Sequence, residues 1–224
     1  MDHNRVLEAF RLEAEALTEA VTGLSEVEWN LPTRCSPWSV RELLGHVSAT
    51  VDRLPGMLEA PPPGEAEVSA VEYYRPDERF SAETNDARIA LGRKRASEAA
   101  DGAAAFSATW RRADELVRDQ PSGRTVRTRH GDAMLLSEFL LTRVVEVAVH
   151  GLDLADALGR APWLTTAAGD AVLELLLGAD HRTAASRLGW EQPHLLRKAT
   201  GREPLDAAET MLVERLGIRW LTLG

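Results

Sequence analysis

Residues 136–158 read LSEFLLTRVVEVAVHGLDLADAL, and this stretch decides the fold. Apolar residues lie on almost every side of a helix drawn through it, which is the pattern of a helix that is buried all round. Gly159 follows directly and Pro162 stands just beyond, as is common where a helix ends. We therefore predict a buried helix over 136–158, surrounded by other elements of the fold.

Four polar side chains interrupt this helix, and they are Arg143, Glu146, His150 and Asp153. At about 100° per residue they fall within one arc of roughly 80°. Buried charges are costly unless they are paired or coordinate a metal. One interpretation is an internal salt-bridge network, in which Arg143 pairs with Glu146. His150 and Asp153 would then form a second pair. The other is a metal site, because a carboxylate and an imidazole one turn apart suit chelation.

Three further long helices are predicted before this one. Apolar residues recur at helical spacing over 2–22, over 36–54 and over a long run from 83 to 117 that weakens near Gly102. The second helix is expected to start at Ser36-Pro37, a cap residue followed by a proline whose missing N–H costs nothing there. Four long helices with such connections predict a mainly α protein built on an up-and-down four-helix bundle.

The connecting segments are predicted to be less regular. Prolines over 55–64 argue against a helix there, and an irregular excursion is expected to continue to about residue 81. The segment 120–132 favours a turn with short strands, since Thr125–Thr128 prefers extended structure. Residues 161–224 hold shorter helical pieces and a final extended run. We interpret them as a small C-terminal α(+β) subdomain beside a bundle domain over 1–160.

Composition excludes several classes of protein. The formal net charge of −9 argues against a nucleic-acid partner, because such proteins need a basic surface. It also argues against binding to anionic membranes. The sequence contains no run of eighteen uninterrupted apolar residues, so no membrane span is predicted. The single cysteine, Cys35, cannot form an internal disulfide, which fits a reducing cytoplasm.

Two separated motifs resemble a known family. The run PTRCSPWSVRELLGHV over 32–47 resembles the second-helix signature of the DinB/YfiT-like superfamily, and more closely that of the mycothiol-dependent maleylpyruvate isomerase family. The run RVVEVAVHGLDL over 143–154 resembles the fourth-helix signature of the same family. The resemblance covers the first 160 residues in order and spacing, and the tail at Thr200-Gly201-Arg202-Glu203 more loosely. It implies a DinB-like bundle with a small C-terminal domain.

The resemblance also implies a ligand set. In that family the histidine of the first motif and the Glu and His of the second bind zinc, and here they are His46, Glu146 and His150. Two histidines and one carboxylate leave a fourth position for water or substrate, as in catalytic zinc sites. The implied cofactors are therefore a divalent metal, with Zn²⁺ expected, and mycothiol, the low-molecular-weight thiol of actinobacteria.

The neighbouring polar residues carry two interpretations each. Asp153 either orients His150 or lies on the helix surface, and Arg143 either holds an anionic substrate or pairs with a carboxylate of its own helix. Arg202 either contacts an acidic substrate or a thiol carboxylate, or is structural. Cys35 is expected to lie about three helical turns below His46, too far to share an ion.

The implied function is thiol chemistry on an electrophilic small molecule. A metal at His46, Glu146 and His150 would activate the thiol, which then attacks the electrophile. If the thiol is expelled again, the enzyme is a cis–trans isomerase of maleylpyruvate type, and if it is retained, an S-transferase. Two other classes remain open from the residues alone: a metal-dependent hydrolase, and a non-catalytic metal-binding bundle.

Overall fold

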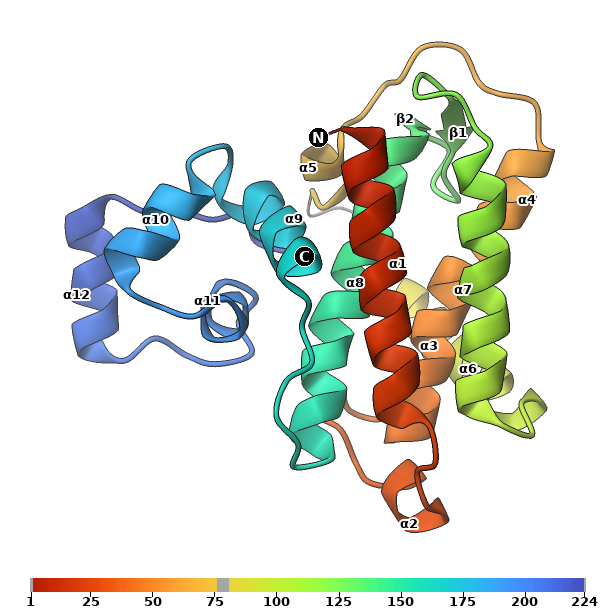
Figure 1. The fold of residues 1–224 in the computed structure, drawn as a ribbon, viewed down its shortest axis with the longest axis horizontal. Helices are drawn as coiled ribbons and strands as arrows, with labels where there is room; N and C mark the ends of the chain where they lie inside the picture. Colours follow the sequence, from red (N-terminus) through yellow and green to blue (C-terminus); the bar gives the residue numbers. More distant parts are fainter. Residues whose placement is uncertain (1, 76–80, 224) are drawn as a thin grey trace.

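Figure 1 shows the fold of the chain in a computed structural model, which describes residues 2–75 and 81–223. In these ranges the chain is mainly helical, as predicted, with one two-stranded antiparallel sheet. The elements are α1 (His3–Val21), α2 (Glu26–Trp29), α3 (Val40–Val51), α4 (Arg53–Glu59), α5 (Ala70–Tyr73), α6 (Ala82–Glu98), α7 (Gly102–Arg118), β1 (Thr125–Arg127), β2 (Ala133–Leu135), α8 (Leu136–Ala157), α9 (Thr166–Leu177), α10 (His181–Leu188), α11 (Gln192–Ala199) and α12 (Ala207–Leu216). Among the described helices, none combines the length and apolar character needed to cross a bilayer.

Helices α1, α3, α7 and α8 form the four-helix bundle, and α6 packs along α3 (Figure 1). The helix predicted over 136–158 is α8, and 17 of its 22 residues are buried. Its apolar side chains include Phe139, Leu140 and Leu152, each almost fully enclosed. Burying a side chain of this kind stabilises a fold by about 1.5–3 kcal/mol. The apolar surface of α8 therefore holds the other three helices around it and fixes its polar residues inside the molecule.

The contact between α3 and α6 depends on two glycines. A Cβ atom added at Gly45 would lie 2.4 Å from the backbone oxygen of Gly92, closer than real Cβ contacts allow. A Cβ added at Gly92 would in turn lie 3.2 Å from the Cβ of His46. The two helices cross here with their backbones in contact, because neither glycine carries a side chain. This close crossing lies beside His46 and fixes the position of that residue.

Two boundaries differ from the prediction. The run over 83–117 is two helices, because Asp101 accepts a hydrogen bond from Ala104 N (3.1 Å) and caps a new one. The second helix starts at Val40 rather than at Ser36-Pro37. Its cap is Ser39, which forms a reciprocal capping box with Glu42.

The prediction that residues 55–64 exclude a helix is wrong at its start. Pro55 is the third residue of α4, in the first turn, where a backbone N–H has no helical partner to lose. Beyond Glu59 the chain is irregular as far as Ser69, and α5 then brings Tyr73 and Tyr74 into the core. The rest of the predicted excursion, over 76–80, lies outside the described residues. The predicted strand near Thr125 is β1, which pairs with β2.

The C-terminal segment is helical where the sequence predicts helices, and α10 is a further helix. The final run has no strand, although Leu221 N donates to Leu176 O (2.8 Å). Helix α9 packs against α1 and α8 (Figure 1). The subdomain boundary at residue 160 stays a prediction.

A buried carboxylate joins the bundle to α9. Glu13 of α1 is fully buried and accepts hydrogen bonds from Thr165 N (2.8 Å) and Thr165 Oγ1 (2.6 Å), at the residue that caps α9. Among the described residues, its other oxygen, Oε1, finds no hydrogen-bond partner, and neither does the buried Nε1 of Trp163. Burial raises the pKa of Glu13 to about 7, although the bonds from Thr165 act in the opposite direction.

Candidate metal centre

Three side chains from two helices of the bundle meet at the predicted metal site. His46 comes from α3, and Glu146 and His150 come from α8, one turn apart. The Nε2 atom of His46 lies 3.4 Å from Glu146 Oε2, and the Nε2 atom of His150 lies 3.5 Å from the same oxygen. One ligand atom from each residue lies within 4.8 Å of the other two. The structure therefore brings the three predicted ligands together.

Two contacts hold the imidazole rings in place. The ring of Trp38 stacks on His46 with 4.5 Å between centroids, so this tryptophan positions a candidate ligand as well as packing. The other ring, of His150, donates from Nδ1 to Asp153 Oδ2 (2.9 Å). When the Nδ1–H of a histidine is held by a carboxylate, Nε2 is the ring nitrogen that can bind a metal, which is the usual arrangement of a metal-bound imidazole.

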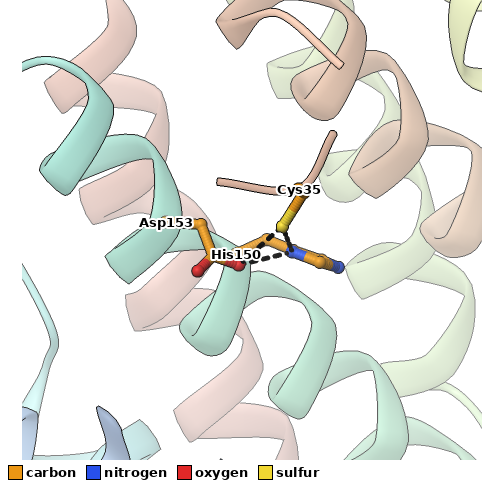
Figure 2. Close-up of side chains that lie close together, drawn as sticks. All are labelled: Cys35, His150 and Asp153. Carbon is orange, nitrogen blue, oxygen red and sulfur yellow. Dashed lines mark hydrogen bonds and ion pairs between the residues drawn. The ribbon is translucent and has the colours of Figure 1, made fainter. Parts of the chain in front are cut away.

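Asp153 is fully buried and accepts hydrogen bonds from three residues around the site. Besides His150, it accepts from Arg202 Nε at Oδ1 (3.2 Å) and from Arg202 Nη2 at Oδ2 (3.1 Å). The thiol of Cys35 donates to Oδ2 (3.2 Å), as Figure 2 shows. Hydrogen bonds from His150 and Arg202 hold the pKa of Asp153 well below its usual range, although burial acts against them. Asp153 is therefore an anion that ties α8 to two distant segments.

Sequence analysis relates Cys35 only to His46, and the structure places it beside another candidate ligand, His150, in a group of metal-ligand type that does not include His46. The sulfur of Cys35 lies 3.9 Å from His150 Nδ1 (Figure 2). The loop before α3 folds back on itself, since Thr33 N donates to Trp38 O (3.0 Å) and Trp38 N donates to Cys35 O (3.0 Å). The turn in the loop brings Cys35 to His150, a contact that an extrapolation along the second helix does not predict.

Cys35, His150 and Asp153 form a second group of metal-ligand type, which overlaps the first. The second group is the poorer cation site, because Asp153 is already neutralised by the Arg202 guanidinium. A cation there would lie beside a fixed positive charge and would displace two hydrogen bonds. The group of His46, Glu146 and His150 instead faces a cavity, which all three residues line. Its two nitrogens and one oxygen are the donor set of a catalytic zinc site, and the residues present fit such an ion.

The charges of the three candidate ligands depend on one another. Burial acts to raise the pKa of Glu146, but hydrogen bonds with His150 and His46 hold it well below its usual range. Burial lowers the pKa of His46. The pKa of His150 is raised, because bonds with Asp153, Cys35 and Glu146 outweigh the opposing effect of burial. Glu146 is therefore ionised and His46 favours its neutral form, the states in which both bind metals.

Arg143 is buried and has several partners. It donates from Nη1 to Thr50 O (3.2 Å) and from Nη2 to Thr142 Oγ1 (3.0 Å). Its Nη2 lies 4.0 Å from Glu146 Oε1, at the limit of an ion pair. The internal network predicted as an alternative is thus present in part, because the His150–Asp153 pair also forms. The salt-bridge network and the candidate metal site are therefore both present, and they share Glu146 and His150.

The cavity beside the ligands measures about 240 Å³. It is rich in arginines, and Glu146 is the one carboxylate among the described residues of its wall. Sequence analysis did not single out the arginines at 53, 88 and 129, since they belong to three separate elements. The lining residues are Trp38, His46, Thr50, Arg53, Tyr73, Tyr74, Asn85, Arg88, Arg129, His130, Arg143, Val145, Glu146, Val149, His150, Arg202 and Leu223.

Fold and site together define a helical-bundle protein with a two-histidine, one-carboxylate candidate metal centre beside a cationic cavity. The family model described as the mycothiol maleylpyruvate isomerase N-terminal domain matches residues 10–155, and the chain belongs to this family. This match confirms the family that the two motifs indicate. It also confirms the predicted class of enzyme, an isomerase or transferase.

Two solved structures resemble the chain over 91% of its length. One is a crystal structure of the mycothiol-dependent maleylpyruvate isomerase, with 16% identity, a TM-score of 0.59 and 90% of that chain covered. The other is a histidine-to-alanine mutant of that isomerase, with 15% identity, a TM-score of 0.59 and 90% covered. At this identity the likeness concerns the fold, and it confirms the predicted DinB-like helical architecture. No curated protein sequence matches the chain.

Proposed function

We propose that the chain is a mycothiol-dependent metalloenzyme that acts on an electrophilic small molecule. His46, Glu146 and His150 hold the divalent metal, and zinc is the expected ion. The observation that carries this proposal is the convergence of the three ligand atoms, within 4.8 Å of one another, on the wall of a cavity. The family match over residues 10–155 supports mycothiol as the thiol cosubstrate.

A zinc ion bound by two histidines and a carboxylate supplies a site at which a thiol loses its proton at neutral pH. The protein's own residues prepare that site. Asp153 holds the Nδ1–H of His150 at 2.9 Å, which fixes the tautomer and directs Nε2 toward the cavity. Trp38 holds the ring of His46 on the other side of the site.

Arg202 binds a polar group of the thiol or the substrate. Its guanidinium is held by Asp153 at two nitrogens and by Thr200 O at the third (3.1 Å). A guanidinium has five N–H groups, so two remain for a ligand in the cavity that Arg202 lines. Lys198 supports the segment, because it bonds Pro204 O (2.9 Å) and pairs with Glu203 (2.8 Å). Arg202 therefore presents its remaining donors in a fixed direction.

The reaction begins when the thiol sulfur attacks the carbon–carbon double bond of a conjugated carbonyl compound. A sulfur–carbon bond forms, the electron pair of the double bond moves to the carbonyl oxygen, and the former double bond is free to rotate. Return of that electron pair expels the thiol and leaves the trans isomer, so the thiol acts as a catalyst. Retention of the adduct, with a proton added to carbon, gives the S-transferase.

Calorimetry with mycothiol tests the proposal. Wild-type protein loaded with zinc should bind mycothiol, and the His46→Ala variant should not. Arg202→Gln should keep its metal and bind the thiol roughly tenfold more weakly, because a charged hydrogen-bonding group is lost. Arg187→Gln in α10 is the matched control for the change of charge. Thiol binding that is equal in the zinc-loaded and metal-free proteins would overturn the mechanism, and hydrolytic turnover without thiol would indicate the hydrolase instead.

A further inference from the structure

Arg202 lies in the turn that ends α11, and two hydrogen bonds fix the backbone of that turn. Arg202 N donates to Arg197 O (2.8 Å), and Gly201 N donates to Lys198 O (3.2 Å). Gly201 has a φ of +69°, in the left-handed region that favours glycine. Such a pair of bonds around a glycine is the Schellman motif, a common end of a helix. The backbone of Arg202 is therefore fixed relative to Arg197, a residue in the last turn of α11.

The side chain of Arg197 attaches this turn to the bundle, where α11 packs against α8 (Figure 1). Arg197 donates from Nη2 to Asp156 Oδ1 (2.6 Å) and from Nε to Asp156 Oδ2 (3.3 Å). Asp156 lies about one turn beyond Asp153, so both carboxylates lie on the same face of α8. Arg202 binds Asp153 through the same two nitrogens, Nε and Nη2. Two guanidiniums of one turn therefore pair with two carboxylates of one helix.

Two points of attachment fix the direction of the Arg202 guanidinium. A single pair with Asp153 would leave the turn free to rotate about that carboxylate. The pair of Arg197 with Asp156 removes this freedom, because both arginines bind as planar forks. Arg34 is no substitute, since its nitrogens lie 3.9 Å from Asp153 Oδ1 and 3.8 Å from Asp156 Oδ2, beyond hydrogen-bond distance.

The pair of Arg197 and Asp156 contributes little to the stability of the fold. The side chain of Arg197 is 17% exposed and that of Asp156 is 38% exposed, and ion pairs in contact with solvent stabilise proteins weakly. Arg197 is not among the described residues of the cavity wall, whereas Arg202 is. The effect of the pair on the site is therefore exerted through the position of Arg202.

We propose that Arg197, held by Asp156, is a positioning residue for the thiol cosubstrate, because it sets the direction from which Arg202 meets the thiol. The inference rests on the proposed function, in which Arg202 binds a polar group of the thiol or the substrate. It adds a second arginine–carboxylate pair to the site, outside the cavity and on the far side of the turn that carries Arg202.

Calorimetry with mycothiol measures the effect on thiol binding. Zinc-loaded Arg197→Gln should keep its metal and bind mycothiol about threefold to fivefold more weakly than the wild type. Arg197→Lys should restore part of the affinity, because it keeps the charge and loses the fork. Arg182→Gln is the matched control, since it breaks an ion pair with Asp170 in the same part of the chain and should bind mycothiol as the wild type does.

Mutant cycles separate positioning from a direct contact. If Arg197 acts through Arg202, the change Arg197→Gln should weaken mycothiol binding no further in an Arg202→Gln background. Asp156→Asn should match Arg197→Gln, and the variant with both changes should bind no more weakly than either alone. Losses that add up in either cycle would overturn the proposal, because the residues would then act independently.

The turn offers a perturbation that changes no charge. Gly201→Ala places a Cβ at a φ of +69° and should weaken mycothiol binding by loosening the turn. Gly189→Ala, at the end of α10, is the matched control: its φ is also +69°, and like Gly201 it has nothing within 4 Å of the added Cβ. It should lose a similar amount of stability and bind mycothiol normally. Unchanged mycothiol binding in Arg197→Gln and Gly201→Ala would overturn the proposal.

A measurement on the metal-free protein keeps the inference separate from the proposed function. The Nε–H of Arg202 can be followed by ¹⁵N NMR and identified by its absence in Arg202→Gln. Its exchange with solvent should be faster in Arg197→Gln than in the wild type, with both proteins shown to be folded by thermal unfolding. Equal exchange would overturn the positioning role, whatever the thiol does. A wild type that binds no mycothiol would contradict the proposed function, and faster exchange in Arg197→Gln would still establish that Arg197 positions Arg202.

Discussion

Replacing Glu13 by glutamine should change how the stability of the protein depends on pH. The carboxyl group is fully buried, and its pKa is about 7 in the fold against 4.5 in an unfolded chain. A raised pKa means that the folded state holds the proton more tightly. The stabilising contribution of the protonated form is therefore complete below pH 4.5 and is lost as the pH rises through about 7.

The magnitude follows from the size of the shift. A difference of one pKa unit corresponds to about 1.4 kcal/mol, so the titration of Glu13 lowers the free energy of unfolding by about 3 kcal/mol in total. Most of this loss falls between about pH 5 and about pH 8. Glutamine keeps an oxygen for Thr165 and has no proton to lose, so the Glu13→Gln variant should lack this part of the pH dependence.

Urea unfolding at about pH 5 and about pH 8 measures the effect. The wild type should lose roughly 2–3 kcal/mol more than Glu13→Gln between these two conditions. Glu15→Gln, at an exposed position of the same helix, should behave as the wild type does. Parallel pH profiles for the wild type and Glu13→Gln would refute the reasoning, because the buried carboxyl would then not titrate in this range.

Four further substitutions test the fold and the site. Gly45→Ala should destabilise the protein by about 1–3 kcal/mol in thermal unfolding, because its Cβ would meet the backbone of α6, whereas Gly56→Ala meets nothing and should stabilise α4 by about 0.5–1 kcal/mol. Cys35→Ser should keep a full equivalent of metal, and the cobalt-loaded wild type should show no thiolate-to-cobalt absorption band. Loss of metal in Cys35→Ser would instead identify the group of Cys35, His150 and Asp153 as the metal site. Asp153→Asn should weaken zinc binding by about tenfold to a hundredfold in a chelator competition, and unchanged affinity would exclude its orienting role.

Helical periodicity explains why most of the bundle is predictable. Helices α1 and α8 follow from their apolar patterns, and the pair Glu146 and His150 follows from its one-turn spacing on a buried helix. His46 is not distinctive by itself and becomes a candidate only through the motif that precedes it. The boundary errors are local, since Asp101 and Ser39 are cap residues whose side-chain bonds the apolar pattern does not report.

The parts of the site that the sequence does not predict depend on tertiary structure. Cys35 reaches His150 because a loop folds back through hydrogen bonds between Thr33 and Trp38. Arg53 and Arg129 lie on separate elements with no shared spacing, so their common cavity is visible only in the fold. Arg202 is indicated only loosely by the sequence of the tail, and its role as the partner of a buried carboxylate requires the packed C-terminal segment.

Metal content is the most direct test of the candidate centre. Protein purified in the presence of zinc, dialysed and measured by atomic emission should hold about one equivalent per chain, as expected of a three-ligand site. His194→Ala, which changes a histidine away from the cavity, should hold the same amount. The His46→Ala variant should be folded and hold almost none. Equal metal in His46→Ala and wild type, or no metal in the wild type, would contradict a centre built from His46, Glu146 and His150.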